Sequence, residues 1–483
     1  MDMKRSLLLL PLFALAAVAC ATGGDDDEGA VTGDDQNVLD RARERGIQTI
    51  HFAAPSAGAP DEQCVIPKHA AGFDYDKDDA EDEKELCSYS FYGTGPKEAG
   101  AAKKDVALCP KLSSTNPGVD VHELLPGKSR EETEATICKT EDRATKHLAK
   151  FKQSITCSYA PSILGYYHLS RALGGAGDVK PAVIRTMDLG EHKKITAEAL
   201  QILARQANDS YPKISWLSYQ RAESNPAVAK QKDGIFTSDL LQIYGGLQDN
   251  VRGENKYSEI NKNAGGSDPS SIFRRSPQYG YVVDARPLAQ IAGRDLASAA
   301  QTVTVMKDIS EMLTMDFLMS QQDRFGNIHE VDYYYFTAED GSIDKVKKAD
   351  VDEGKKAKPA GAVLVKKMIM KDNDCGGPSK NNVVKAAGMM DQIRHMAPSF
   401  YAHVQWLQSV FAQGMETPKF FSSEVLFTQG DIDMLRANLN TLAPKLKTMC
   451  KAGQLKLDVN LEAHLAGKGH DPASCDRAEA PGM

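Results

Sequence analysis

Apolar residues recur at helical spacing in five segments of the chain. These segments are 157–173, 194–207, 285–319, about 384–414 and 430–450. In the first of them, Gly174 and Gly175 follow the last apolar residue, Leu173, and glycine commonly ends a helix. The pattern therefore predicts a mainly helical second half of the chain, preceded by two further helices.

Strand-like patterns are shorter. Residues 179–185 predict an edge strand that is entered through Pro181, because proline cannot donate a hydrogen bond to a neighbouring strand. Residues 331–337 and 362–371 predict two more strands, joined by the charged segment 338–361, which we expect to be a solvated hairpin tip. Together with the helices, these strands predict an α+β fold.

Length and composition indicate a globular protein of several parts. The chain has 483 residues, of which 41% are hydrophobic, enough to bury a sizeable core. The polar, Gly/Ser-rich segment 256–277 predicts an inter-lobe loop between an N lobe, 38–255, and a C lobe, 278–478. Within the N lobe, residues 38–130 contain clusters of turn-forming residues and are expected to be loop-rich. With a formal net charge of -8, the chain offers no basic field for a phosphate backbone, so nucleic acid is not an expected partner.

The first 19 residues read as an export signal, with a short basic start and an apolar stretch. The sequence Ala17-Val18-Ala19-Cys20 resembles the bacterial lipobox, in which Cys20 carries the lipid after cleavage. A plain secretory signal with a chance cysteine is the alternative. The acidic, Gly/Asp-rich segment 20–37 is expected to be a tether. These features predict a lipid-anchored protein of the bacterial cell envelope, and Ala21 beside Cys20 favours the outer membrane.

The cysteines fit an exported protein. Eight of them follow Cys20, an even number that predicts up to four disulfides in an oxidising compartment. Zinc is the competing use, but no pair has C-x-x-C spacing. The sequence leaves the pairing open, although five of the eight lie in the N lobe. The eight are Cys64, Cys87, Cys109, Cys138, Cys157, Cys375, Cys450 and Cys475.

Two segments carry a pattern that suits phosphoryl transfer. An apolar helix ends in a D-R-x-x-N loop, 323–327, and about fifty residues later a strand runs into Lys371-Asp372-Asn373-Asp374-Cys375-Gly376-Gly377. In such a reaction one carboxylate orients the acceptor hydroxyl. A second carboxylate and an amide oxygen hold the metal ion on the nucleotide.

These segments resemble the catalytic core of atypical kinases, above all the secretory-pathway kinases that phosphorylate casein, and also the type II phosphatidylinositol kinases. Those families have a D-[YF]-[LI]-x4-D-R loop followed by a strand that ends in D-N-G. Residues 165–174 and 179–185 are similar to a further helix and strand of the family. The resemblance implies a two-lobed kinase-like fold with a disulfide-bonded N lobe, ATP with Mg²⁺ or Mn²⁺ as cofactors, and a hydroxyl of a protein or small molecule as acceptor.

Carried over residue by residue, the resemblance makes Asp323 the catalytic aspartate and Asp372 the metal-binding aspartate. Asn327 matches a second metal ligand, although it stands four residues after Asp323 where better-known kinases place it five after. Asp374 also fits a D-x-G pattern, so the register of the metal aspartate is open between Asp372 and Asp374. A surface ion pair of Asp323 with Arg324 is the alternative interpretation of the first motif.

The nucleotide-clamping lysine is expected just before the helix at 157–173. Lys146, Lys150 and Lys152 are candidates, and Lys150 and Lys152 share a face if this segment is a strand. The family's partner glutamate falls near Ile163, which cannot pair with a lysine. A catalytically inactive scaffold that binds a partner at the envelope is therefore the second functional hypothesis.

The anchoring hypothesis predicts the behaviour of a Cys20→Ala variant. Because the lipid is attached through the Cys20 sulfur, this variant should accumulate as an uncleaved or unlipidated precursor. Radiolabelled palmitate measures the outcome. Incorporation at the wild-type level in the variant would contradict lipid anchoring at this residue.

Overall fold

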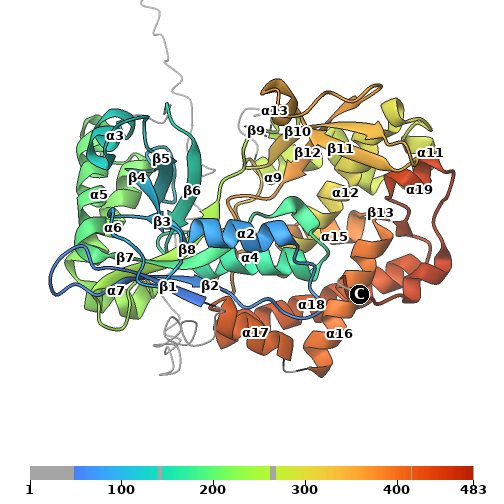
Figure 1. The fold of residues 1–483 in the computed structure, drawn as a ribbon. Helices are drawn as coiled ribbons and strands as arrows, with labels where there is room; N and C mark the ends of the chain where they lie inside the picture. The colour runs from blue at the N-terminus through green and yellow to red at the C-terminus, as the bar shows by residue number, and fades with distance from the viewer. Residues whose placement is uncertain (1–47, 140–143, 262–267, 415, 482–483) are drawn as a thin grey trace, which may run out of the picture.

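The computed structural model describes residues 48–139, 144–261, 268–414 and 416–481. The expected signal sequence 1–19, the lipidation site Cys20 and the tether 20–37 lie outside these ranges. The described chain has an α+β fold, with a sheet in its N-terminal part and a largely helical C-terminal part (Figure 1). Among the described residues, no helix is both long enough and apolar enough to cross a membrane.

The N-terminal part is built on an eight-stranded sheet with the order β1-β2-β7-β8-β6-β5-β4-β3. All neighbouring strands are antiparallel except β3 and β4, which are parallel. Strand β8 lies between β6 and β7, so it joins segments that precede and follow the first long helix. The strands are β1 (Gln48–Phe52), β2 (Glu62–Ile66), β3 (Tyr89–Ser90), β4 (Lys104–Pro110), β5 (Val119–Glu123), β6 (His147–Lys152), β7 (Ala182–Asp188) and β8 (Gln242–Asp249).

One sequence-based expectation for this part is incomplete and another is wrong. The loop-rich segment 38–130 also supplies, from residue 48, five strands of the sheet. Strand β7 is not an edge strand, because it pairs with β2 on one side and β8 on the other. Pro181 directly precedes the strand, so its missing N–H removes no bond from the strand ladder. Its carbonyl still accepts a hydrogen bond from the Asp249 N–H, 3.1 Å away.

Five helices accompany this sheet. Trp216 and Tyr219 of α6 are fully buried in the same apolar cluster as Phe151 of β6. Two disulfides add covalent links, Cys64–Cys87 between β2 and the end of α2, and Cys109–Cys138 between β4 and the end of α3. The helices are α2 (Lys77–Leu86), α3 (Arg130–Ile137), α5 (Leu189–Ile202), α6 (Tyr211–Ser224) and α7 (Pro226–Asp233).

The C-terminal part contains a smaller sheet with the order β11-β10-β12, in which β9 also pairs with β10. The segment 338–361 is more ordered than a solvated hairpin tip, because it contributes strand β11 and helix α13. The strands are β9 (Glu254–Lys256), β10 (His329–Thr337), β11 (Ile343–Lys347) and β12 (Val363–Ile369), and a two-stranded parallel pair is formed by β13 (His395–Met396) and β14 (Lys456–Leu457).

Helix α12 (Leu296–Leu318) is the central helix of this part. Its side chains are buried almost all round, and Asp295 caps its N-terminus by accepting from the Ser298 N–H. It therefore fixes the position of the loop that follows it. The other helices are α8 (Ser258–Asn261), α9 (Pro269–Arg274), α10 (Pro277–Val283), α11 (Leu288–Ile291), α13 (Lys348–Asp352), α14 (Val383–Ala386), α15 (Met389–Gln392), α16 (Pro398–Gln413), α17 (Glu416–Glu424), α18 (Gln429–Lys451) and α19 (Leu461–Leu465).

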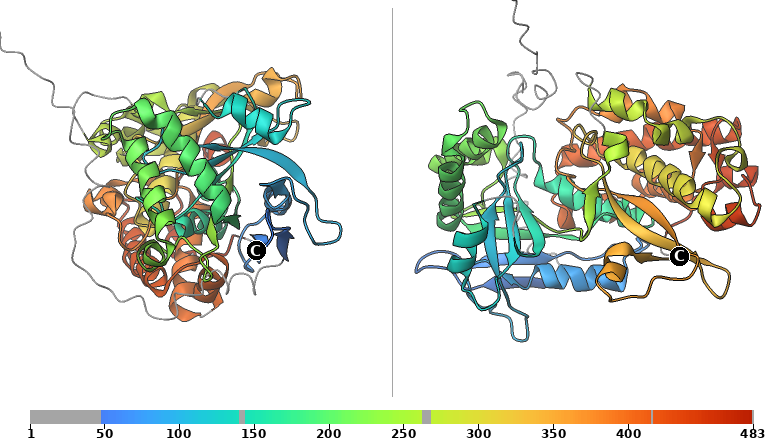
Figure 2. Two further views of the ribbon diagram at one scale, coloured as in Figure 1. Left: turned by 90° about the vertical axis from the view of Figure 1, so that its left-hand side faces the viewer. Right: turned by 90° about the horizontal axis from the view of Figure 1, so that it is seen from above.

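Helix α4 (Ala160–Ala172) connects the two parts. It confirms the predicted helix, and it lies with α2 between the N-terminal sheet and the C-terminal helices (Figure 1). It contacts β7 and β8 as well as α12. Seen from above, the green helices α5 and α6 lie at the opposite end of the molecule from the orange and red C-terminal helices (Figure 2, right). The region around α4 is thus the junction at which both parts can contribute side chains to one site.

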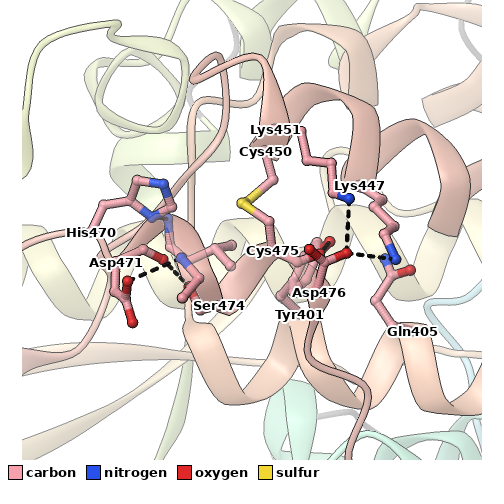
Figure 3. Close-up of a disulfide and its surroundings, with 12 residues drawn as sticks. Tyr401, Gln405, Lys447, Cys450, Lys451, His470, Asp471, Ser474, Cys475 and Asp476 are labelled. Atoms are coloured by element: carbon pink, nitrogen blue, oxygen red, sulfur yellow. Dashed lines mark hydrogen bonds and ion pairs between the residues drawn. A yellow bond between two sulfur atoms is a disulfide. The ribbon is translucent and has the colours of Figure 1, made fainter.

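A third disulfide, Cys450–Cys475, joins the end of α18 to a short 3-10 helix, Pro472–Asp476 (Figure 3). On the same 3-10 helix, the Asp476 Oδ1 forms ion pairs with the Nζ atoms of Lys447 and Lys451, at 3.0 and 2.9 Å. Six of the eight expected cysteines are therefore in disulfides. The remaining two, Cys157 and Cys375, are buried.

Candidate functional site

The structure brings the predicted lysines and aspartates together. Lys150 and Lys152 lie on β6 and point the same way, as the strand period predicts. The Lys152 Nζ donates to the Asp374 Oδ2 at 2.8 Å and lies 3.7 Å from the Asp372 Oδ1. The Lys150 Nζ lies 4.0 Å from the same Asp372 oxygen. Asp372 and Asp374, the two alternatives for the metal-binding aspartate, thus lie beside the same lysine.

These residues line a cavity between the two parts of the molecule. Strands β6 and β8 supply one wall, and the loop after β12 supplies the other. The space left between the side chains is only about 20 Å³, little more than one water molecule needs. The lining residues are Lys150, Lys152, Ile163, Lys180, Gln248, Asp249, Asn250, Val251, Met370, Lys371, Asp372, Asn373 and Asp374.

Two further lysines, which the sequence did not single out, complete the charge cluster. Lys111 directly follows β4, and its Nζ lies 4.0 Å from the Asp372 Oδ1. Lys371 precedes Asp372 in the chain and forms an ion pair with Glu254 of β9. Because Lys371 directly precedes the D-N-D motif, its sequence position was a signal from which its place in the cluster could have been predicted. Lys111 is 261 residues away from Asp372 in the chain, and only the strand order of the sheet brings it near.

The charges perturb one another strongly. Burial favours the neutral form of Asp372, but the four ammonium groups around it outweigh burial and hold its pKa well below the usual range. Burial and the neighbouring Lys152 ammonium lower the pKa of Lys111 to about 8. The pKa of Asp374 is also lowered, because Lys152 opposes the effect of burial. At neutral pH the cluster therefore holds two carboxylates and a larger number of ammonium groups.

Helix α4 shapes the loop that carries the two aspartates. The Ser162 hydroxyl on α4 donates to the Asn373 carbonyl at 2.6 Å and accepts from the Gly376 N–H at 3.2 Å. A Cβ at Gly376 would stand 2.6 Å from that hydroxyl oxygen, so only glycine fits here. The Tyr159 N–H donates to the Asp374 carbonyl at 2.6 Å. These bonds fix the loop backbone, and Asp372 adopts a left-handed φ of 52° within it.

Arg324 holds the same loop from the other side. It is 2% exposed and pairs with Asp316 of α12, which is fully buried, at 2.9 Å. Its guanidinium also donates to the Lys371 carbonyl at 2.6 Å and to the Asn373 Oδ1 at 2.6 Å. The alternative interpretation, a surface ion pair of Asp323 with Arg324, is therefore wrong, because Arg324 is buried and its partner is Asp316.

Asp323 lies next to this arrangement. Its N–H donates to the Gln321 side chain at 3.1 Å, and the neighbouring Gln322 N–H donates to the Cys375 carbonyl at 3.2 Å. Burial, together with the negative charges of Asp374 and Asp372, raises the pKa of Asp323 to about 6. A carboxyl with such a pKa can exchange a proton near neutral pH.

Two other positions that the resemblance singled out, Asn327 and Ile163, do not have the surroundings that the kinase pattern predicts. Asn327 does not line the cavity described above, and its N–H donates to the Arg324 carbonyl at 3.1 Å. Ile163, at the position that the resemblance gives to a glutamate, does line the cavity. The acidic partner of Lys152 is Asp374 instead. Gly245 of β8 allows this lysine's strand to approach, because a Cβ there would meet the Lys152 carbonyl oxygen at 2.0 Å.

Comparison with known proteins adds no relative to this geometry. No protein-family model, no curated protein and no solved structure matches the chain.

The buried pair of Arg324 and Asp316 gives a stability prediction. Arg324→Met removes the positive charge and leaves the Asp316 carboxylate buried without it, so the free energy of unfolding should fall by about 3–5 kcal/mol. Arg436→Met is the matched control, because Arg436 pairs with Asp433 on the surface, and its loss should cost at most about 1 kcal/mol. Urea unfolding of both variants tests this. Equal, small effects would show that the buried pair does not hold the site.

Proposed function

We propose that this chain is a phosphotransferase, which moves a phosphoryl group from ATP to a hydroxyl with the help of Mg²⁺ or Mn²⁺. The observation that carries the proposal is the convergence of four lysines around Asp372 at the edge of one cavity, with Asp374 paired to one of them and Asp323 close by. We further propose that the α+β architecture is a two-lobed kinase-like fold. The N-terminal sheet, the helical C-terminal part and a site at their junction support this.

The charge balance of the cavity suits a metal–nucleotide complex. Carboxylate oxygens are the ligands that Mg²⁺ prefers, and Asp372 and Asp374 would supply them. Ammonium groups bind phosphate oxygens, and Lys111, Lys150, Lys152 and Lys371 would supply them. When bound, the cation and ATP would supply the phosphoryl donor and neutralise the charge that develops on it. A purely cationic ligand would meet an excess of ammonium groups, and a purely anionic one would meet two carboxylates.

The small free space of the cavity requires a rearrangement on binding. Lys152 and Asp374 now satisfy each other, and the space between the lining residues is about 20 Å³. The lysine side chains have a flexible stem of four carbons and can rotate away from the aspartates, whereas the aspartates are held in place by the loop backbone. A ligand would therefore enter by taking the lysines from the aspartates. Neither class of group would be left buried and unpaired.

Asp323 suits the role of proton acceptor or positioning group for the acceptor hydroxyl. It is negative above pH 6, and it follows α12, whose packing fixes the loop. The acceptor would be a hydroxyl of a protein or a small molecule. If Cys20 is lipidated, that acceptor lies at the bacterial cell envelope, with the outer membrane as the favoured location.

The second candidate is a catalytically inactive scaffold. The small free space of the cavity and the hydrophobic Ile163 in its wall favour it. Both candidates agree on the fold and differ in whether the chain binds a nucleotide with a metal ion.

Two aspartate variants test the proposed roles against each other. Asp372→Asn should abolish metal-dependent nucleotide binding, because it removes a carboxylate that offsets the cation's charge. Asp323→Asn should leave binding within a few fold and reduce phosphoryl transfer by roughly 10²-fold or more. Calorimetry with ATP and Mn²⁺, paired with a transfer assay, measures both.

The control for this pair is Asp340→Asn, an exposed aspartate in a surface turn, which should behave like the wild type. Unchanged nucleotide binding by Asp372→Asn would move the metal role to Asp374. No nucleotide binding by the intact protein with any divalent metal would leave the scaffold hypothesis.

The pKa of Asp323 predicts a pH profile. A proton acceptor must be deprotonated, so kcat/KM should fall about tenfold per pH unit below pH 6 and level off above it. The residual activity of Asp323→Asn should lack this acidic limb. An acidic limb that persists unchanged in the variant would assign the ionisation to another group.

A further inference from the structure

The two cysteines outside the disulfides face each other. The Sγ atoms of Cys157 and Cys375 are 2.8 Å apart, and both side chains are buried. A disulfide has a sulfur–sulfur distance of about 2.05 Å, so the two atoms need to approach by only about 0.8 Å to be bonded. The residues are 218 positions apart in the chain, so the fold, rather than local sequence, brings them together.

Each cysteine lies on a segment of the candidate site. Cys157 comes five residues after Lys152, between β6 and α4, and Cys375 directly follows Asp374. The Gln322 side-chain amide donates to the Cys157 Sγ at 2.8 Å, and the Asn116 amide donates to the Cys375 Sγ at 3.3 Å. The sulfur pair therefore lies between the segment that follows Lys152 and the loops that hold Asp323 and Asp374.

The backbone on both sides of the pair is in an unfavourable conformation. Thr156 has a φ of 55° and Asp372 a φ of 52°. A left-handed φ is a genuine outlier for a β-branched residue such as threonine, and it persists only where the surroundings hold it. The Thr156 hydroxyl donates to the Asn116 Oδ1 at 3.2 Å and to the Ile155 carbonyl at 2.6 Å, so Asn116, which donates to the Cys375 Sγ, is a non-covalent bridge between the two segments. A covalent link between the two strained segments would hold both.

We infer that Cys157 and Cys375 form a fourth disulfide, which covalently joins the segment after Lys152 to the loop that carries Asp374. The other three disulfides indicate that the chain folds where disulfide donors are present. The oxidant is a protein or small-molecule disulfide. The thiolate of one cysteine attacks it and releases one thiolate, and the second cysteine then attacks the mixed disulfide and releases the other. The two protons lost by the cysteines pass through solvent to the two released thiolates, so the donor disulfide is reduced to two thiols.

This bond would act on the site by limiting the movement of the aspartate loop. With the link closed, Asp374 stays near Lys152 and the backbone conformation at Asp372 is retained. With the link open, the loop gains freedom that a metal–nucleotide complex would have to remove on binding. This consequence for nucleotide affinity rests on the proposed function, whereas the existence of the bond does not.

Peptide mapping of the wild-type protein tests the bond directly. The protein is folded in a buffer of oxidised and reduced glutathione. It is then unfolded by a denaturant in the presence of iodoacetamide, without reductant, and digested with trypsin. We expect peptide 153–171 to be linked to peptide 372–380. The pair of peptides 105–111 and 131–139, which contains Cys109–Cys138, is the internal control. If the control pair is linked while Cys157 and Cys375 are both alkylated, the inference is overturned.

Serine variants test the consequence. The double variant Cys157→Ser with Cys375→Ser should bind Mn²⁺–ATP roughly tenfold more weakly than the wild type. The matched control, Cys450→Ser with Cys475→Ser, removes the disulfide between α18 and the 3-10 helix Pro472–Asp476, neither of which lines the cavity, and should leave this affinity unchanged. Equal affinities in the double variant and the wild type would overturn the effect on the site. If the wild type shows the linked peptides but binds no nucleotide, the proposed function fails and the disulfide stands.

Discussion

The buried ion pair between Arg324 and Asp316 is the constraint on which the candidate site depends. A guanidinium and a carboxylate removed from water are tolerated only when each remaining hydrogen-bonding group also finds a partner. Arg324 meets this requirement by donating to the Lys371 carbonyl and the Asn373 side chain, and Tyr166 donates to Asp316 at 2.7 Å. The need to satisfy one buried cation thus fixes helix α12, helix α4 and the aspartate loop relative to one another.

A second consequence of burial is the choice of partner for Lys152. Ile163 of helix α4 lines the same cavity as Lys152, but its side chain is uncharged and cannot pair with the ammonium group. The only way to keep the ammonium group buried without a large energetic cost is to bring a carboxylate from the other part of the molecule. Asp374 does so, and the contact between the two parts is therefore made by charged groups that a ligand can compete for.

The sequence predicted the helices well and the N-terminal strands poorly, and the reason lies in burial. Helices α12 and α18 have long apolar patterns at helical spacing, and such patterns can be recognised without knowledge of the tertiary structure. Strand β4 is buried on both faces, so Val106-Ala107-Leu108-Cys109 shows no alternation and resembles a short apolar loop. At the site, motif spacing placed Lys150, Lys152 and both aspartates in one cavity. Lys111 could not be predicted, because its place depends on the pairing of β4 with β5 and of β5 with β6, and on the contact of that sheet with the Asp372 loop more than two hundred residues later.

The direct bond between Lys152 and Asp374 has a thermodynamic consequence. In the proposed function, a nucleotide that bound alone would take the lysine and leave a buried carboxylate without its cation, while a divalent ion that bound alone would displace the ammonium group into a like-charged neighbourhood. Each ligand removes the penalty that the other creates, so their affinities must rise together. By linkage, the factor by which the metal ion strengthens nucleotide binding equals the factor by which the nucleotide strengthens metal binding. A cavity that worked in the proposed way would therefore discriminate between a complete metal–nucleotide complex and either component by itself.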